Sequence, residues 1–250
     1  MIPDRQILNG LMFKKRKLKM GEEKKLTGVN QEYEKVIQYI YGRMQDGSLM
    51  IGSKLPTERA IAEELDIGRN SIREALSTLS GMGIIRRVQG SGNYISGDVG
   101  SAIQQIIQMM LALGSITKKD ICEFRRVIDK SICSILLNKG LSEDYRDTIE
   151  RILANMKVEQ ELPVEPDKSF HEILVRATEN NIFITIMQSL TKIYREWIDR
   201  ALVKTDAGQK DMLYEVHFNM YKGLVDKNKD QVMNAIDRHY DFIDGLVEDN

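Results

Sequence analysis

The chain has 250 residues, of which 42% are hydrophobic and 29% charged, with 4 prolines and a formal net charge of -1. This composition excludes collagen-like, proline-rich and wholly disordered chains, and the length suits two compact domains. Two cysteines exclude a disulfide scaffold, and no stretch approaches the roughly 20 apolar residues that a bilayer span needs. Because the N-terminus also lacks a signal-peptide pattern, we expect a cytoplasmic protein.

Positive charge is concentrated at the start of the chain. Residues 1–28 carry 8 basic and 3 acidic side chains, whereas residues 29–95 carry 8 of each. We interpret residues 1–28 as a basic, disordered extension, and contact with phosphates is the alternative role for it.

The pattern between residues 31 and 65 predicts two helices. Apolar side chains recur every three or four positions from Gln31 to Met44, which is the spacing of a helix with one buried face. Pro56 then interrupts extension, and Thr57 is a residue type that caps helix N-termini. A second helix is therefore expected from Thr57 through Glu64.

The next segment predicts a tight turn, a third helix and a hairpin. Asp66-Ile67-Gly68 is short enough to turn the chain sharply into a helix over residues 70–82. Residues 84–88 and 93–95 have a period of two on either side of the glycine-rich segment 89–92, which predicts a β-hairpin. Helix, helix, turn, helix and hairpin in this order form a winged helix-turn-helix.

Seven amphipathic segments after Ser96 predict an all-helical second domain. They cover roughly residues 102–113, 117–138, 142–157, 166–178, 181–204, 209–226 and 229–247. The fold class is thus mainly α: an N-terminal winged helix-turn-helix and a C-terminal bundle of about six or seven helices. We assign residues 29–96 to the first domain, 97–116 to a linker or connecting helix, and 117–250 to the second domain.

The third predicted helix carries candidate DNA-reading side chains. A recognition helix contacts base edges from its N-terminal end, because that end enters the major groove. Polar residues suited to bases or phosphates stand there: Arg69, Asn70, Ser71 and Arg73. Arg59 in the preceding helix and Gly90 at the hairpin tip are further candidates. The alternative is that these arginines are ordinary exposed charges.

Five stretches of the first domain form a recognisable pattern. They are Leu55-Pro56-Thr57-Glu58-Arg59, Ala62-Glu63-Glu64-Leu65, the stretch from Arg69 to Leu76, Gly83-Ile84-Ile85 and Gly90-Ser91-Gly92. Together they resemble the N-terminal domain of the GntR family of bacterial transcription regulators. The resemblance implies that Arg59, Arg69 and Arg73 contact the operator, and it matches Gly90 to the wing glycine. We expect Thr57 and these three arginines to govern operator affinity. Gly68 and Asn70-Ser71 depart from the usual residues, so the operator sequence stays open.

The chain contains 3 histidines, and each lies on the apolar stripe of a predicted helix. Asp167 and His171 are spaced i and i+4 and project from one helix face, while His217 and His239 could converge from the last two helices. Three nitrogens and one carboxylate suit a divalent transition metal such as zinc, nickel, iron or manganese, without choosing among them. The alternative is that the histidines are ordinary core residues.

Asp167-Lys168-Ser169-Phe170-His171, followed by Asn180, His217 and His239, resembles the FCD effector domain of the FadR subfamily of GntR regulators. The resemblance covers about residues 117–247 and implies that Asp167 and the histidines bind a metal whose coordination a small carboxylate effector completes. It also implies that Arg125 faces the effector, the alternative being an ordinary salt bridge. Phe170 is expected in the core. Members that bind acyl-CoA lack the histidine set, which disfavours that effector.

The sequence therefore predicts a homodimeric regulator, with repression favoured over activation, that binds a pseudo-palindromic operator on double-stranded DNA and responds to a small carboxylate. An enzyme is not expected, because H-E-x-x-H, G-x-S-x-G and phosphate-loop motifs are missing. Two alternatives stay open. One is a metal-dependent enzyme that uses the Asp and His cluster with Glu172 or Glu215 as base, and the other is a regulator whose metal is purely structural.

Overall fold

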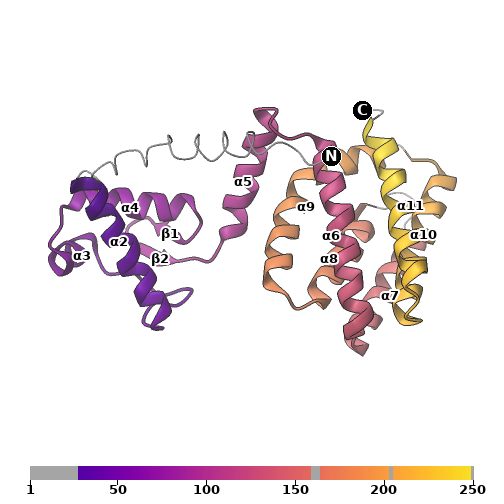
Figure 1. Cartoon of the computed structure of the whole chain (residues 1–250), viewed down its shortest axis with the longest axis horizontal. Helices are drawn as coiled ribbons and strands as arrows, with labels where there is room; N and C mark the ends of the chain where they lie inside the picture. Colours follow the sequence, from indigo (N-terminus) through magenta and orange to yellow (C-terminus); the bar gives the residue numbers. More distant parts are fainter. Residues whose placement is uncertain (1–27, 159–163, 203–204, 249–250) are drawn as a thin grey trace, which may run out of the picture. The chain divides into compact units, whose positions relative to one another are not determined.

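The computed structural model describes residues 28–158, 164–202 and 205–248. The chain divides into two compact units, with the boundary after Asp98, and each unit is a separate body (Figure 1). The basic extension expected over residues 1–28 lies outside the described residues except for Gly28. Among the described helices, none combines the length and the apolar character that crossing a membrane requires.

The described part of the first unit contains three helices and a two-stranded sheet (Figure 1). They are α2 (Gly28–Gln45), α3 (Glu58–Leu65), α4 (Arg69–Gly81), β1 (Ile85–Val88) and β2 (Gly92–Ile95). The strands pair antiparallel, with Ile85 opposite Ile95. Gly90 and Gly92 connect them with φ values of +74° and +126°, which glycine adopts without a steric penalty. The predicted winged helix-turn-helix is confirmed.

The tight turn between α3 and α4 follows from local chemistry. The Thr57 hydroxyl accepts a hydrogen bond from the backbone N–H of Ala60 at 3.2 Å and caps α3, as the sequence predicts. Asp66 ends that helix in the left-handed region with a φ of +53°, a conformation that aspartate tolerates better than most residues. Apolar side chains from all three helices then pack together at 0–1% exposure: Val36, Ile40, Ile61, Ile72 and Leu76. This packing holds α4 with Arg69, Asn70 and Arg73 facing solvent.

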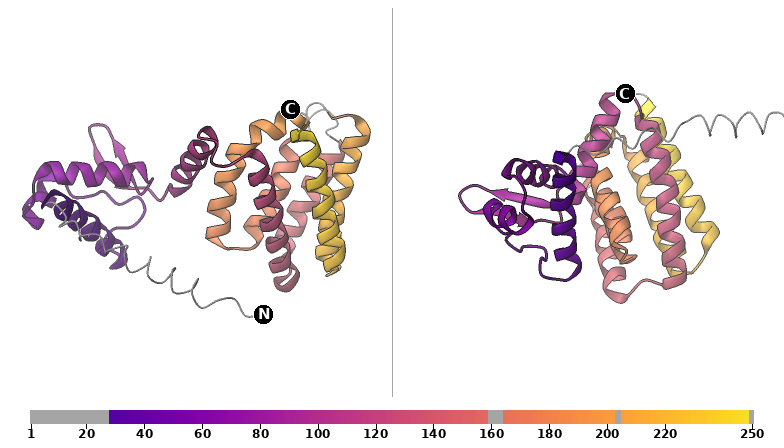
Figure 2. Two further views of the ribbon diagram at one scale, coloured as in Figure 1. Left: turned by 45° about the horizontal axis from the view of Figure 1, so that its top comes forward. Right: turned by 60° about the vertical axis from the view of Figure 1, so that its left-hand side comes forward.

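The second unit is all-helical in its described residues, which confirms the predicted bundle. Its helices are α5 (Val99–Ala112), α6 (Lys118–Lys139), α7 (Glu143–Val158), α8 (Val164–Ala177), α9 (Asn181–Leu202), α10 (Ala207–Val225) and α11 (Lys229–Glu248). Figures 1 and 2 show α6, α8, α9, α10 and α11 packed side by side. Phe170 is 0% exposed in their shared core, where the sequence places it.

Helix α5 packs against α9 within the second unit. The Ser189 hydroxyl, on α9, donates a hydrogen bond to the carbonyl oxygen of Gly100 at 2.9 Å. A Cβ atom at position 100 would lie 3.1 Å from the Ser189 hydroxyl, so the close approach of the two helices favours glycine there. Most of the segment expected as a connection is thus a packed helix of this unit.

Candidate metal centre and DNA-binding surface

The four residues predicted as metal ligands lie together in the second unit. Asp167 and His171 come from α8, His217 from α10 and His239 from α11, and one ligand atom of each lies within 4.8 Å of the others. Their exposed fractions are 8%, 5%, 0% and 1%. The four converge because each occupies the apolar face by which its helix packs. The structure therefore brings together the complete predicted set.

A backbone hydrogen bond fixes the proton of His217. Its Nδ1 atom lies 2.7 Å from the carbonyl oxygen of Leu213. Because a carbonyl only accepts, Nδ1 carries a proton, and Nε2 is the ring nitrogen that faces the cluster. That Nε2 atom lies 3.3 Å from Nε2 of His171 and 3.3 Å from Oδ1 of Asp167.

A buried carboxylate orients His171 in the same way. Nδ1 of His171 lies 3.0 Å from Oδ2 of Asp129, a residue of α6 that is 6% exposed. The Tyr240 hydroxyl, on α11, donates a second hydrogen bond to the same oxygen at 2.6 Å. The carboxylate thus accepts a hydrogen bond from Nδ1–H of His171 and leaves Nε2 facing the cluster, the arrangement usual behind metal-bound histidines.

Burial and neighbouring charges set the protonation of the cluster. Burial lowers the pKa of His239 well below its usual range, and the nearby His217 and His171 rings add to the effect. This ring is therefore neutral and able to coordinate. Burial alone would raise the pKa of Asp167, but the adjacent His217 and His171 outweigh it and hold that pKa below its usual range. Asp167 is accordingly a carboxylate.

Unsatisfied atoms show that the cluster fits a cation. Oδ1 of Asp167 and Nδ1 of His239 are buried and have no hydrogen-bond partner among the described residues. Nε2 of His217 and Nε2 of His171 also face each other at 3.3 Å. Such unpaired acceptors are costly in a buried site unless a positive group lies between them. Three nitrogens and one oxygen suit a divalent transition metal, and the identity of the metal stays open.

Arg125 lies beside this cluster on α6 and is 4% exposed. Its guanidinium carbon stacks 3.7 Å from the ring centre of Tyr194, on α9. Its Nε atom has no partner, and it makes no ion pair with any described residue. An ordinary salt bridge therefore does not explain this arginine. A buried cation held by an aromatic face and short of acceptors is suited to an anionic ligand.

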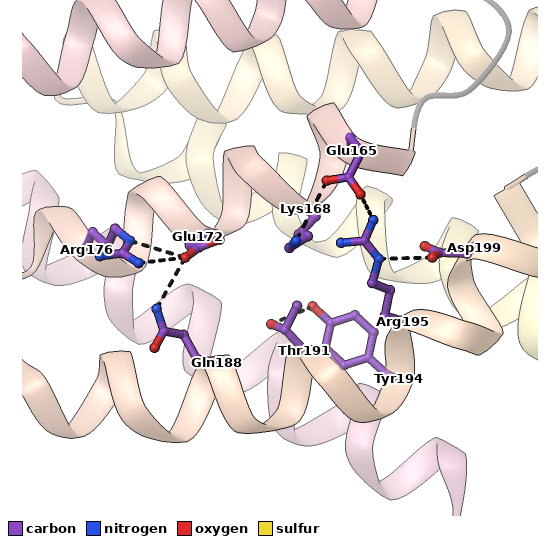
Figure 3. Close-up of polar contacts among 9 residues, drawn as sticks. All are labelled: Glu165, Lys168, Glu172, Arg176, Gln188, Thr191, Tyr194, Arg195 and Asp199. Atoms are coloured by element: carbon purple, nitrogen blue, oxygen red, sulfur yellow. Dashed lines mark hydrogen bonds and ion pairs between the residues drawn. The ribbon is translucent and has the colours of Figure 1, made fainter. Parts of the chain in front are cut away.

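A cavity of about 280 Å³ adjoins both Arg125 and His171. Most of its lining comes from α8 and α9: Lys168, Glu172, Val175, Arg176, Ile184, Met187, Gln188, Thr191 and Lys192. Figure 3 shows α8 and α9 facing each other, joined by a hydrogen bond that the Gln188 side chain donates to Glu172. The volume is at the lower end of the range for small-molecule sites, so the cavity suits a compact ligand.

The predicted DNA contacts occupy the first unit, and most are exposed. Arg69, Asn70 and Arg73 lie in the first turns of α4, whose N-terminus has no side-chain cap. The side chains of Arg73 and Arg59 are 60% and 72% exposed and pair with Glu58 and Glu63. Gly90 is also exposed, and a Cβ atom there would meet nothing within 4 Å. The helix end and the hairpin tip can therefore approach a groove without rearrangement.

Ser71 differs from its neighbours on α4. It is 4% exposed, and its hydroxyl donates a hydrogen bond to Oε2 of Glu32, on α2, at 2.7 Å. The side chain thus points into the unit and ties α4 to α2. Thr57 likewise uses its hydroxyl to cap α3. These two hydroxyls hold the reading helices in place. The buried Ser71 side chain faces away from solvent, whereas Thr57 is exposed and its hydroxyl keeps a donor beside the cap.

Sequence reasoning missed the partners that support the predicted ligands. Asp129 and Tyr240 orient His171, and the ring of Tyr194 stacks against the guanidinium of Arg125. One signal was available: Asp129 shares the buried stripe of α6 with apolar residues, and an acid in such a stripe indicates a buried partner. Tyr194 and Tyr240 gave no such signal, because aromatic residues on an apolar stripe are ordinary core residues.

Comparisons with known proteins agree with both units. Residues 32–95 match the family described as bacterial regulatory proteins, gntR family, and residues 120–242 match the FCD domain. The chain is 26% identical over 219 residues to the HTH-type transcriptional regulator LutR of Bacillus subtilis (strain 168), covering 83% of this chain and 99% of that protein. It is 28% identical over 224 residues to the uncharacterized HTH-type transcriptional regulator YcbG of the same strain, with coverages of 81% and 92%.

A solved structure shares the fold. Streptococcus agalactiae GntR superposes with a TM-score of 0.62 at 23% identity, covering 86% of this chain and 98% of that chain. The two family matches fall on the two units, and the relatives are similar over nearly their whole length. The chain therefore belongs to the GntR family of bacterial transcription regulators and, by its FCD domain, to the FadR-like subfamily.

Proposed function

We propose that this regulator is a cytoplasmic homodimer whose affinity for a pseudo-palindromic operator changes when a small carboxylate binds at a divalent metal site in the helical unit. The observation that carries the proposal is the buried cluster of one aspartate and three histidines next to a cavity with an unpaired buried arginine. The same chain carries a winged helix-turn-helix, so one molecule combines a ligand site with a DNA-reading element.

In this proposal the first turn of α4 enters the major groove. Arg69, Arg73 and Asn70 are exposed and are residue types that bind guanine or adenine edges in bidentate fashion. Arg59 contacts a phosphate or base from α3, and Gly90 lets the wing approach the duplex. One recognition helix for each half-site matches the two-fold symmetry of a dimer to a pseudo-palindrome.

Asp167, His171, His217 and His239 would hold the metal in the second unit. A divalent ion supplies there a Lewis-acidic centre for a carboxylate oxygen. Arg125 orients the effector by pairing with its carboxylate, and Tyr194 keeps the guanidinium in place at the lining of the cavity. Asp129 holds the proton of His171 on Nδ1, so that Nε2 stays available.

Regulation requires that the effector bind one conformation of the protein more tightly than another. Operator affinity then changes by the ratio of the effector affinities of the two conformations, and by no more. Release of the operator on effector binding corresponds to repression, which we favour, and tighter binding corresponds to activation. The sign is measured directly by titrating effector into the protein–DNA complex.

The residues weighed as catalytic bases support a regulator over an enzyme. Oε1 of Glu172 accepts hydrogen bonds from Arg176 at 2.8 Å and from Gln188 at 3.2 Å, so this carboxylate is already engaged. Glu215 is exposed on α10, outside the cavity lining. The named relatives are also transcriptional regulators.

The test combines metal content with operator affinity in the full-length protein. Elemental analysis of the untreated protein is expected to give about one transition metal per chain, as a single four-ligand site predicts. His171→Ala should lose the metal, while Asp211→Asn, an exposed acid on α10, should retain it. Fluorescence anisotropy on DNA selected from a random pool then measures operator affinity with and without metal and with added carboxylates.

Each outcome separates the alternatives. A change in operator affinity that needs both metal and an added acid supports the proposal. Metal loss that lowers the melting temperature, with no acid affecting operator affinity, indicates a structural metal. A folded protein that takes up neither zinc nor nickel would overturn the metal site, and the histidines would then be ordinary core residues.

A further inference from the structure

The charges that line the cavity are not balanced. Four lining residues are cationic, Arg125, Lys168, Arg176 and Lys192, and only Glu172 is anionic. Glu172 is paired with Arg176 at 2.8 Å, so the charges of these two side chains compensate each other (Figure 3). Three cations therefore remain for an occupant, one at the buried end and two lysines elsewhere on the lining.

The two lysines have little compensation of their own. Nζ of Lys168 lies 3.7 Å from Glu165, whose side chain is 65% exposed and which is also paired with Arg195. A long, exposed and shared ion pair of this kind contributes little to stability. Lys192 makes no ion pair or hydrogen bond with a described residue. Figure 3 shows Lys168 on α8 across from Thr191 on α9.

The rest of the lining limits the size and character of the ligand. Val175, Ile184 and Met187 give the cavity an apolar part, which suits a short carbon chain and not a continuous row of charges. A cavity of about 280 Å³ is small among small-molecule sites, so it suits a short-chain acid.

We propose that the effector is a compact acid with two anionic groups, one held by Arg125 at the metal end and the other held by Lys168 and Lys192. This inference rests on the proposed function and names the class of its effector. The second group is a carboxylate or a phosphate-type group, because lysine binds either as a point charge. Lys168 is half-buried and Lys192 is exposed, so both ammonium groups can reach water and are available to a second anionic group of the ligand.

Calorimetric titration of the full-length, metal-loaded protein tests this inference. Succinate is compared with butyrate and glutarate with valerate, because each pair has the same number of carbons and differs by one carboxylate. We expect each diacid to bind at least tenfold more tightly than its monoacid. A third probe, 3-phosphonopropionate, replaces one carboxylate of succinate and shows which second group is preferred. Metal content is measured again after each titration, because diacids can extract metals.

Variants assign the effect to the lysines. Lys168→Met and Lys192→Met should each lower the affinity for succinate by a larger factor than the affinity for butyrate, so that the preference for the diacid falls. Lys222→Met, an exposed lysine on α10 outside the cavity, is the matched control and should leave both affinities unchanged.

The outcomes distinguish this inference from the function on which it rests. Monoacids that bind as tightly as their diacids overturn the inference and leave a carboxylate-responsive regulator in place. Lysine variants that keep the full diacid preference also overturn it, since another group would then hold the second anion. If no acid of either series binds to the metal-loaded protein, both the inference and the effector part of the proposed function fail.

Discussion

Replacement of Asp129 by alanine tests how the metal centre is built. Oδ2 of Asp129 accepts hydrogen bonds from Nδ1 of His171 at 3.0 Å and from the Tyr240 hydroxyl at 2.6 Å. Without it, two buried donors lose their acceptor, at a cost of about 1–3 kcal/mol each. The His171 ring also becomes free to place its proton on Nε2. Metal affinity should then fall roughly 10- to 100-fold, as for the loss of other partners behind metal-bound histidines.

Two measurements separate the effect on metal binding from the effect on stability. Competition with a chromophoric chelator at fixed pH gives the metal affinity, and thermal unfolding of metal-free protein gives the stability. Asp129→Asn keeps one acceptor oxygen and nearly the same volume, so it should lose less affinity than Asp129→Ala. Tyr240→Phe removes only a hydroxyl and leaves the contact between His171 and Asp129 intact. Its metal affinity should stay close to that of the wild type.

Two results would refute this reasoning. One is a folded Asp129→Ala protein that binds metal as tightly as the wild type, because the orientation of His171 would then not depend on the carboxylate. The other is a Tyr240→Phe protein that loses as much metal affinity as Asp129→Ala, which would point to the packing of α6 against α11 as the cause.

Three further predictions concern the two units. Arg69→Ala should weaken operator binding by about 1–3 kcal/mol in anisotropy titrations, the range for one bidentate base contact, while the exposed Arg146→Ala on α7 should not. Ser71→Ala should destabilise the first unit by about 1.5–3 kcal/mol in thermal unfolding, because its hydroxyl is bonded to the Glu32 carboxylate. Unchanged melting with weakened operator binding would instead make Ser71 a direct DNA contact. Removal of metal by a chelator should lower the melting temperature of the helical unit by about 5–10 °C. The reason is that metal at 100 times its Kd contributes about 2.7 kcal/mol to the free energy of unfolding. An unchanged melting temperature would contradict a ligated metal.

The fold was predictable because its signals are local. The cap at Thr57, the turn before α4 and the glycines of the hairpin each depend on a few neighbouring residues. Apolar periodicity then located the helices of the second unit, and predicted and observed ends differ by no more than three residues. A periodic stripe persists through a helix, so small errors at the ends do not hide it.

The metal ligands were predictable for a related reason. A histidine on an apolar stripe must become buried, so three such residues and an aspartate one turn before the first could be grouped before their distances were known. The contacts that hold the metal ligands in place were not predictable in this way. The contacts of Asp129 with His171 and Tyr240 join three helices, and their spacing in the chain carries no signal of that meeting.

The sequence by itself therefore determined the order of the elements, the family, and which face of each helix is buried. Only the tertiary structure decided which residues of different helices meet: Ser71 with Glu32, Arg125 with Tyr194, and the two lysines with the cavity. The physical reason lies in helix packing. Periodicity defines the direction of a side chain around its own axis, whereas the partner of that side chain depends on how far each helix is rotated and shifted along its neighbour.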